Sequence, residues 1–97
     1  DSVIDYAVQL VRNTRPGPFM SSDEIMYGAS PRASMWLVRA AKALALIEGR
    51  EYITPSDIQK FVFDIFRHRV MPTYASLASG KTADFFIKKV LQLTPSP

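Results

Sequence analysis

The sequence predicts an all-α fold built from four helices. Apolar residues recur at spacings of three and four along most of the chain, which is the period of an amphipathic helix. Prolines and glycines divide the chain into segments of helical length, and no stretch shows the alternation typical of a half-buried strand. Of the 97 residues, 47% are hydrophobic, which favours a folded core. We therefore expect a single helical domain over residues 1–97.

The first helix is expected over residues 2–14. Its apolar residues share one face at helical spacing. Prolines 16 and 18 end it, because neither can continue a helix. A loop over residues 16–29 follows, and its apolar side chains are expected to pack against the body of the domain. The residues expected inside are Val3, Ala7, Leu10 and Val11 from the helix, and Phe19, Met20, Ile25 and Met26 from the loop.

The second helix is expected over residues 30–48. Ser30 is a good N-cap and Pro31 suits the first helical position, where a missing N–H costs nothing. Gly49 marks the end. The second half of this helix is apolar nearly all round, which is typical of a central, buried helix. We also expect Trp36 to lie in the core, because large aromatic residues are mostly buried.

Two further helices complete the predicted bundle. A third, over residues 54–68, repeats the cap-then-proline pattern at Thr54 and Pro55, and it carries an acid, Asp57, in its first turn. Residues 73–81 are expected to form a loop, after which Thr82 caps the last helix. The inward residues are predicted to be Ile58, Phe61, Val62 and Ile65 in the third helix, and Phe86, Ile87, Val90 and Leu91 in the last.

Composition excludes several classes of function. The 12 Lys and Arg residues against 9 Asp and Glu give a net charge of +3, which is too weak to indicate a nucleic-acid binder on its own. The absence of cysteine excludes disulfides and thiolate metal sites and fits a reducing compartment. No apolar run approaches the ~20 residues needed to span a bilayer. The chain opens at Asp1 without a visible signal peptide, so we expect a piece of a longer protein.

Arg32 is the main candidate for a binding residue. A helix start carries partial positive charge, which makes it a mildly unfavourable place for a cation. An arginine beside unpaired backbone N–H groups, however, makes a strong seat for a phosphate or carboxylate. Arg39 and Lys42 follow at spacings of seven and three, so the three cations share one stripe of the helix. In the alternative, Arg32 pairs with a nearby acid such as Asp23 or Glu24, and ion pairs of this kind are common on surfaces.

Two other motifs do not predict a functional site. Residues 80–82 read Gly-Lys-Thr, the end of a nucleotide phosphate loop, but that loop needs a glycine where this chain has Ala75. We therefore expect Gly80 to form a turn. His68, the only histidine, lies between two arginines at no metal-ligand spacing, and we expect it to pack structurally. No paired carboxylates, activated nucleophile or metal site is evident, so nothing predicts catalysis by this chain alone.

Five spaced segments agree, in order, with one known family. They are GASPRAS at 28–34, LVRAAKALA at 37–45, GREYITPSDI at 49–58, RHR at 67–69 and TAD at 82–84. Together they resemble the lid subdomain of the MoxR-type AAA+ ATPases. The resemblance covers nearly the whole chain, and residues 16–27 are the least alike. It implies a four-helix lid that follows a nucleotide-binding core, and that core is absent from these 97 residues.

The resemblance also implies a role for Arg32. In the family, the arginine of the Ser-Pro-Arg element is the sensor 2 arginine, which reaches the γ-phosphate of ATP bound on the core. Ser30 and Arg39 would accompany it at the ATP phosphates. The implied cofactors are ATP and Mg²⁺ in the full-length protein, while this chain alone is expected to bind neither and to hydrolyse nothing. The implied location is the cytoplasm.

The implied partners are the protein's own AAA+ core, neighbouring subunits of a hexameric ring, and proteins with von Willebrand A domains. The implied work is chaperone-like or metal-insertion assembly, with no membrane and no nucleic acid involved. Two alternatives stay open. A long central helix, a short extended link at Tyr52 and Ile53 and a third helix begun by Thr-Pro are also typical of a histone-like DNA-binding module. A helical domain that serves only protein interaction would leave Arg32 in an ordinary ion pair.

Overall fold

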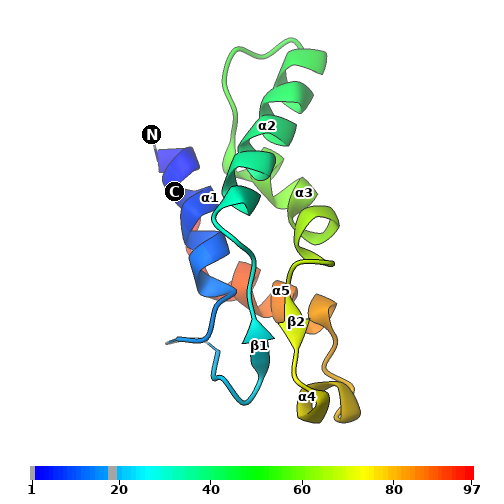
Figure 1. Ribbon diagram of the computed structural model, residues 1–97. Coiled ribbons are helices and arrows are strands. Elements are labelled where there is room, and N and C mark those ends of the chain that lie inside the picture. The colour runs from blue at the N-terminus through cyan, green and yellow to red at the C-terminus, as the bar shows by residue number, and fades with distance from the viewer. Residues whose placement is uncertain (1, 18–19) are drawn as a thin grey trace.

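The computed structural model describes residues 2–17 and 20–97, and helices dominate this part of the chain (Figure 1). The all-α prediction is confirmed, with four long helices, one short helix and a minimal two-stranded sheet among the described residues. The elements are α1 (Ser2–Asn13), β1 (Ile25–Tyr27), α2 (Arg32–Ile47), α3 (Pro55–Phe66), β2 (Met71–Pro72), α4 (Tyr74–Ala78) and α5 (Ala83–Leu93).

Two of the short elements correct the sequence prediction. The expected loop over residues 73–81 contains α4, which begins where the Thr73 hydroxyl accepts a hydrogen bond from the Ser76 N–H at 3.2 Å. The expected loop over 16–29 contains β1, whose Ile25 pairs with Pro72 of β2 in an antiparallel arrangement. Strands of three and two residues are too short to show alternation, so their pairing could not be read from the sequence.

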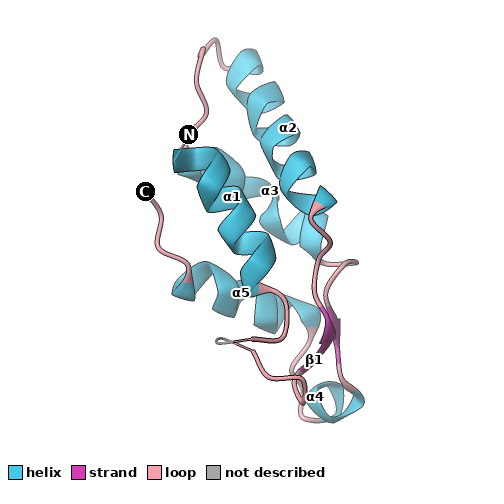
Figure 2. Ribbon diagram, turned by 60° about the vertical axis from the view of Figure 1, so that its left-hand side comes forward, coloured by secondary structure: helices cyan, strands magenta, loops and turns pink. Residues whose placement is uncertain are grey.

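The core lies where α2 packs against α1 and α3, with α5 closing the bundle from α3 and α1 (Figure 2). The inward residues predicted for α1 are all buried, as are two of the four for α3 and three of the four for α5. The others, Phe61, Ile65 and Leu91, are partly buried against the core. Met20 and Ile25 are buried too, whereas Phe19 lies outside the described residues. Met26 is 59% exposed, which corrects the prediction, because successive strand residues point to opposite faces.

The outward side of α2 is the largest departure from the predicted core. Its buried residues form one narrow stripe made of Ala33, Leu37, Ala41 and Ala45. The last turn projects past the other helices, and Leu46 and Ile47 are 78% and 82% exposed (Figure 1). Trp36 is also exposed. The predictions that α2 is buried on all sides and that Trp36 lies in the core are therefore both wrong. The many apolar residues of α2 predicted burial on all sides, but only the narrow stripe is fully buried, with Val38 partly buried against the core.

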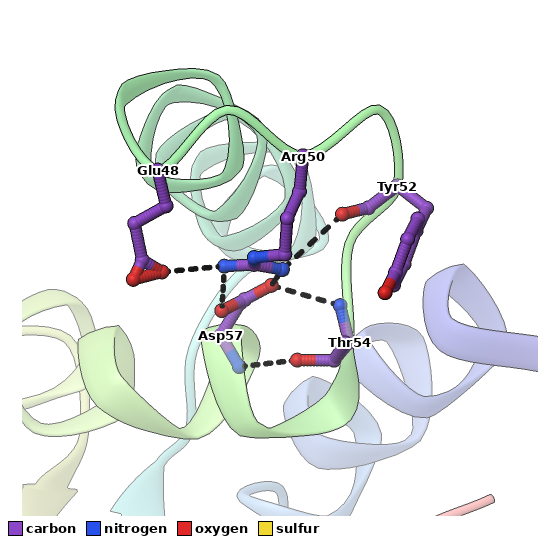
Figure 3. A network of polar contacts seen from close by, with 5 residues as sticks. All are labelled: Glu48, Arg50, Tyr52, Thr54 and Asp57. Atoms are coloured by element: carbon purple, nitrogen blue, oxygen red, sulfur yellow. Dashed lines mark hydrogen bonds and ion pairs between the residues drawn. The ribbon is translucent and has the colours of Figure 1, made fainter.

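The connection from α2 to α3 is fixed by a polar network (Figure 3). Gly49 ends α2 as predicted, with a φ of +75° that suits glycine. The Arg50 guanidinium donates to both carboxylate oxygens of Asp57, at 2.7 and 2.8 Å, and also to Glu48. Thr54 and Asp57 form the reciprocal capping box that begins α3. These bonds, above all those from Arg50, hold the pKa of the Asp57 carboxyl well below its usual range.

The start of α1 and the last residues of the chain lie close together in both views (Figures 1 and 2). The Asn13 side chain donates to the Thr94 hydroxyl at 2.8 Å, joining the end of α1 to the end of α5. Residues 95–97 then border a shallow hollow shared with the first two turns of α1. The molecule is elongated, with principal extents of 45 × 21 × 21 Å. None of its described helices combines the length and apolar character needed to cross a membrane.

Candidate functional site

The start of α2 differs from its prediction in a way that matters for binding. Pro31, with helical backbone angles, occupies the N-cap position, and the Ser30 hydroxyl forms no capping hydrogen bond among the described residues. The Ser30 carbonyl instead accepts from the Ala33 N–H at 2.9 Å, and the Pro31 carbonyl accepts from the Ser34 N–H at 3.2 Å. The predicted Ser30 cap is therefore wrong. Because two early amides are already paired, any anion bound here depends chiefly on side chains.

Arg32 presents an exposed guanidinium as the first residue of α2. Within residues 2–17 and 20–97, its side chain takes part in no ion pair or hydrogen bond. The expected alternative partner Glu24 is engaged elsewhere, since its carboxylate accepts from the Ser21 N–H at 3.2 Å and lies 3.9 Å from Lys89. Both contacts lower the pKa of Glu24, the Ser21 bond most. Arg32 is thus left available to a ligand.

Arg32 shares an open hollow of about 310 Å³ with Met35, Trp36 and Arg39, and we call these four residues the α2 outer face. The Arg39 guanidinium lies over the Trp36 ring, 5.5 Å from its centroid. Met35 and Trp36 are 54% and 47% exposed, although both are large and apolar. Two cations without an acid among the lining residues form a donor set that fits a phosphate group, because a guanidinium can bind phosphate through two parallel N–H groups.

Lys42, the third cation of the predicted stripe, is not part of this hollow. It lies on the same side of α2 but borders a separate depression of about 560 Å³, which includes Leu46, Arg50 and Tyr52. The structure therefore brings Arg32 and Arg39 together and leaves Lys42 apart.

His68 and its neighbours lie in the turn after α3 and do not line the hollow of the α2 outer face. His68 is exposed, which corrects the expectation that it packs structurally. Arg67 forms an ion pair with Asp84 at 2.8 Å, and this bond raises the pKa of Arg67. Arg69 donates to the Ile65 carbonyl at 2.9 Å. Both arginines thus tie the end of α3 to the structure around it.

The Gly-Lys-Thr motif is a helix connection, as predicted. Gly80 has a φ of +82° in the turn after α4, and Thr82 is the N-cap residue of α5, although its hydroxyl makes no capping bond. Lys81 lies over the Phe85 ring at 5.7 Å. Across the described residues, no group of three or more His, Cys, Asp or Glu side chains is placed to hold a metal ion.

Sequence reasoning missed the contact that fixes the entry to α2. The buried Thr14 hydroxyl donates to the Val11 carbonyl at 2.6 Å and accepts from the Ala29 N–H at 2.9 Å. Arg15 donates to the Ala29 carbonyl at 3.3 Å. Gly28 passes so close that a Cβ there would lie 2.4 Å from the Thr14 carbonyl oxygen. Gly28 was the one available signal, because a glycine can mark a close backbone approach.

Comparison with known proteins identifies the class of this fold. The family described as the AAA lid domain matches residues 19–90, and the chain belongs to that family. It is 36% identical over 100 residues to chaperone MoxR1 of Mycobacterium tuberculosis, covering 99% of this chain and 26% of that protein. It is 35% identical over 92 residues to protein MoxR of Methylorubrum extorquens, covering 86% of this chain and 26% of that protein. These matches confirm the predicted resemblance to the lid of MoxR-type proteins.

A solved structure agrees with this assignment. The crystal structure of a protein from Cytophaga hutchinsonii, described as an ATPase, matches with a TM-score of 0.89 and 33% identity. The match covers all of this chain and 31% of that one, so the chain spans less than a third of the length of these relatives. The AAA lid assignment replaces the histone-like alternative, because a single family accounts for most of the sequence.

Proposed function

We propose that this chain is the lid of a MoxR-type AAA+ ATPase, in which Arg32 is the sensor 2 arginine. The observation that carries the proposal is the exposed guanidinium of Arg32, which begins α2 without a partner among the described residues. A residue of this kind, beside a second arginine and in a chain of the AAA lid family, is suited to reach a phosphate held on another domain.

The mechanism follows from the α2 outer face. ATP, when bound with Mg²⁺ on a core outside this chain, supplies a γ-phosphate whose charge must be offset during transfer. Arg32 places a planar, permanently charged group against those oxygens, and Arg39 adds a second positive charge further along the helix. Met35 and Trp36 exclude water once the core covers them, which strengthens the electrostatic contact. Arg32 holds the lid closed only while the γ-phosphate is present.

The test is ATP hydrolysis by the full-length protein, comparing wild type with Arg32→Ala. We expect kcat to fall by about 100-fold, the scale seen when one preorganised transition-state contact is removed. Arg32→Lys should recover only part of the rate, because an ammonium group cannot bind bidentately. Arg69→Ala is the matched control, since it removes an exposed arginine of the α3 end. Wild-type turnover in a folded Arg32→Ala protein would refute the sensor 2 assignment.

The wider assembly is part of the same proposal. The lid associates with its own core and, through it, with neighbouring subunits of a hexameric ring. The name of the MoxR1 relative supports chaperone-like work. We propose metal-insertion assembly with von Willebrand A domain partners as the other form that this work can take. Sedimentation of the full-length protein with and without ATP tests the ring: a hexamer with nucleotide supports it, and a monomer under both conditions refutes it.

The 97-residue chain alone is expected to have no measurable ATPase activity and no measurable affinity for ATP. The groups that it offers for binding phosphate are the side chains of Arg32 and Arg39 and the hydroxyl of Ser30, which all lie on an open surface. Titration of the isolated chain with ATP should therefore show no saturable heat at micromolar concentrations. Tight binding would place a complete nucleotide site within the lid and would change the mechanism above.

A further inference from the structure

Among the described residues, the segment 28–31 between β1 and α2 is hydrogen-bonded outside itself and α2 only at Ala29. Ala29 is fully buried, and both its N–H and its carbonyl are bonded to the end of α1, the first by Thr14 and the second by Arg15. The next two carbonyls, of Ser30 and Pro31, are used to begin α2 itself. We call the contact of Thr14 and Arg15 with Ala29 the α1 clamp. Arg32 follows Ala29 by only three residues.

We propose that the α1 clamp positions Arg32, with Thr14 as the principal positioning residue. The inference rests on the proposed function, because it concerns how the sensor arginine is held. Arg32 has no bond of its own to fix its direction within the described structure, so its place is set by where α2 begins. That start is set in turn by the Thr14 hydroxyl, which is itself held by the Val11 carbonyl at 2.6 Å.

The segment at the α1 clamp is closely packed. Gly28 runs against the backbone and hydroxyl of Thr14 with no space for a side chain, and Ala29 next to it is held by two hydrogen bonds, to Thr14 and from Arg15. Loss of the Thr14 hydroxyl would leave the buried Ala29 N–H without its partner and would free the segment to move. A shift of about 1 Å at a catalytic group can cost about 100-fold in rate.

The experiment uses the full-length ATPase and a cycle of variants. Thr14→Val removes the hydroxyl with little change of shape, while Thr14→Ser keeps it. Each is measured alone and combined with Arg32→Ala, for kcat and KM in ATP hydrolysis and for the midpoint of thermal unfolding. Arg15→Ala loosens the other half of the clamp at an exposed residue, so it remains informative if Thr14→Val does not fold. Arg12→Ala, which removes an exposed arginine in the last turn of α1, is its matched control.

The expected result is a loss in kcat of about 10-fold or more for Thr14→Val at nearly unchanged KM, with recovery in Thr14→Ser. In the Arg32→Ala background the same change should have no further effect, because the residue it positions is gone. A wild-type kcat in both folded Thr14→Val and Arg15→Ala, or losses that multiply with that of Arg32→Ala, overturns this inference alone. An unchanged rate in Arg32→Ala overturns the proposed function and this inference with it.

Discussion

At the scale of single residues, position 28 requires glycine because there is no space for a side chain, and not because of its backbone angles. A Cβ at this position would lie 2.4 Å from the Thr14 carbonyl oxygen and 2.5 Å from its carbon, so the backbone of one segment must move. We expect Gly28→Ala to lower the free energy of unfolding by about 1–3 kcal/mol, as overpacking does elsewhere. Gly17→Ala is the matched control, because among the described residues its Cβ would meet only the Arg15 carbonyl oxygen, at 3.8 Å. Urea unfolding of both variants should separate them, and equal stability would contradict the close approach.

Asp57 makes a second prediction at this scale. Its folded pKa is depressed mainly by the Arg50 hydrogen bonds, while its unfolded pKa is about 3.9. The stabilising contribution is therefore fully present above that unfolded pKa and is lost as pH falls through the folded value. We expect Asp57→Asn to cost about 2 kcal/mol at pH 7, because it leaves the Arg50 charge poorly matched. Its stability should also fall less steeply than that of wild type below pH ~4, as measured by unfolding curves. Parallel curves would show that Asp57 is not the group that titrates.

At the scale of elements, α2 combines a buried stripe with an exposed apolar end. Leu37 is fully buried, whereas Leu46, on the same helix, is 78% exposed. We expect Leu37→Ala to lower the free energy of unfolding by about 2–5 kcal/mol and Leu46→Ala to change it by less than about 0.5 kcal/mol. Chemical unfolding of the two variants compares the same substitution in two environments. A large loss in Leu46→Ala would mean that the last turn of α2 is packed in solution.

Local chemistry explains which elements the sequence could predict. Gly49 and the Thr54 capping box act within a few residues, so the end of α2 and the start of α3 were predicted correctly. Arg32 and Arg39 were also placed on one face correctly, because helical spacing fixes that relation. The Ala29 contact with Thr14 spans 15 residues and leaves no periodic signal. The exposure of Trp36 escaped prediction because an apolar side chain suits both the core and a face that another domain can cover.

At the scale of the whole molecule, the proposed function requires the two arginines of the α2 outer face to act together in the full-length protein. Arg39 shares the hollow with Arg32, whereas Lys42 borders a different one. We expect Arg39→Ala to raise the KM for ATP or lower kcat by about 10-fold, a smaller loss than that of Arg32→Ala, because it lies further from the helix start. Lys42→Ala should stay near wild type. Equal losses in both variants would show that overall positive charge, and not the shared hollow, governs turnover.

Because the first and last described residues lie close together, the same packed bundle could be formed by a chain whose helices are connected in a different order. The last residues lie beside the first turns of α1, and the Asn13 bond to Thr94 joins the two elements nearby. A short peptide could therefore link the ends into a circle, and the circle could be cut at the exposed turn around Gly80, which lies outside the buried stripe of α2. Such a circular permutant would keep the same contacts between helices. The domain could also be inserted into another protein, because the connections to its first and last residues would lie side by side.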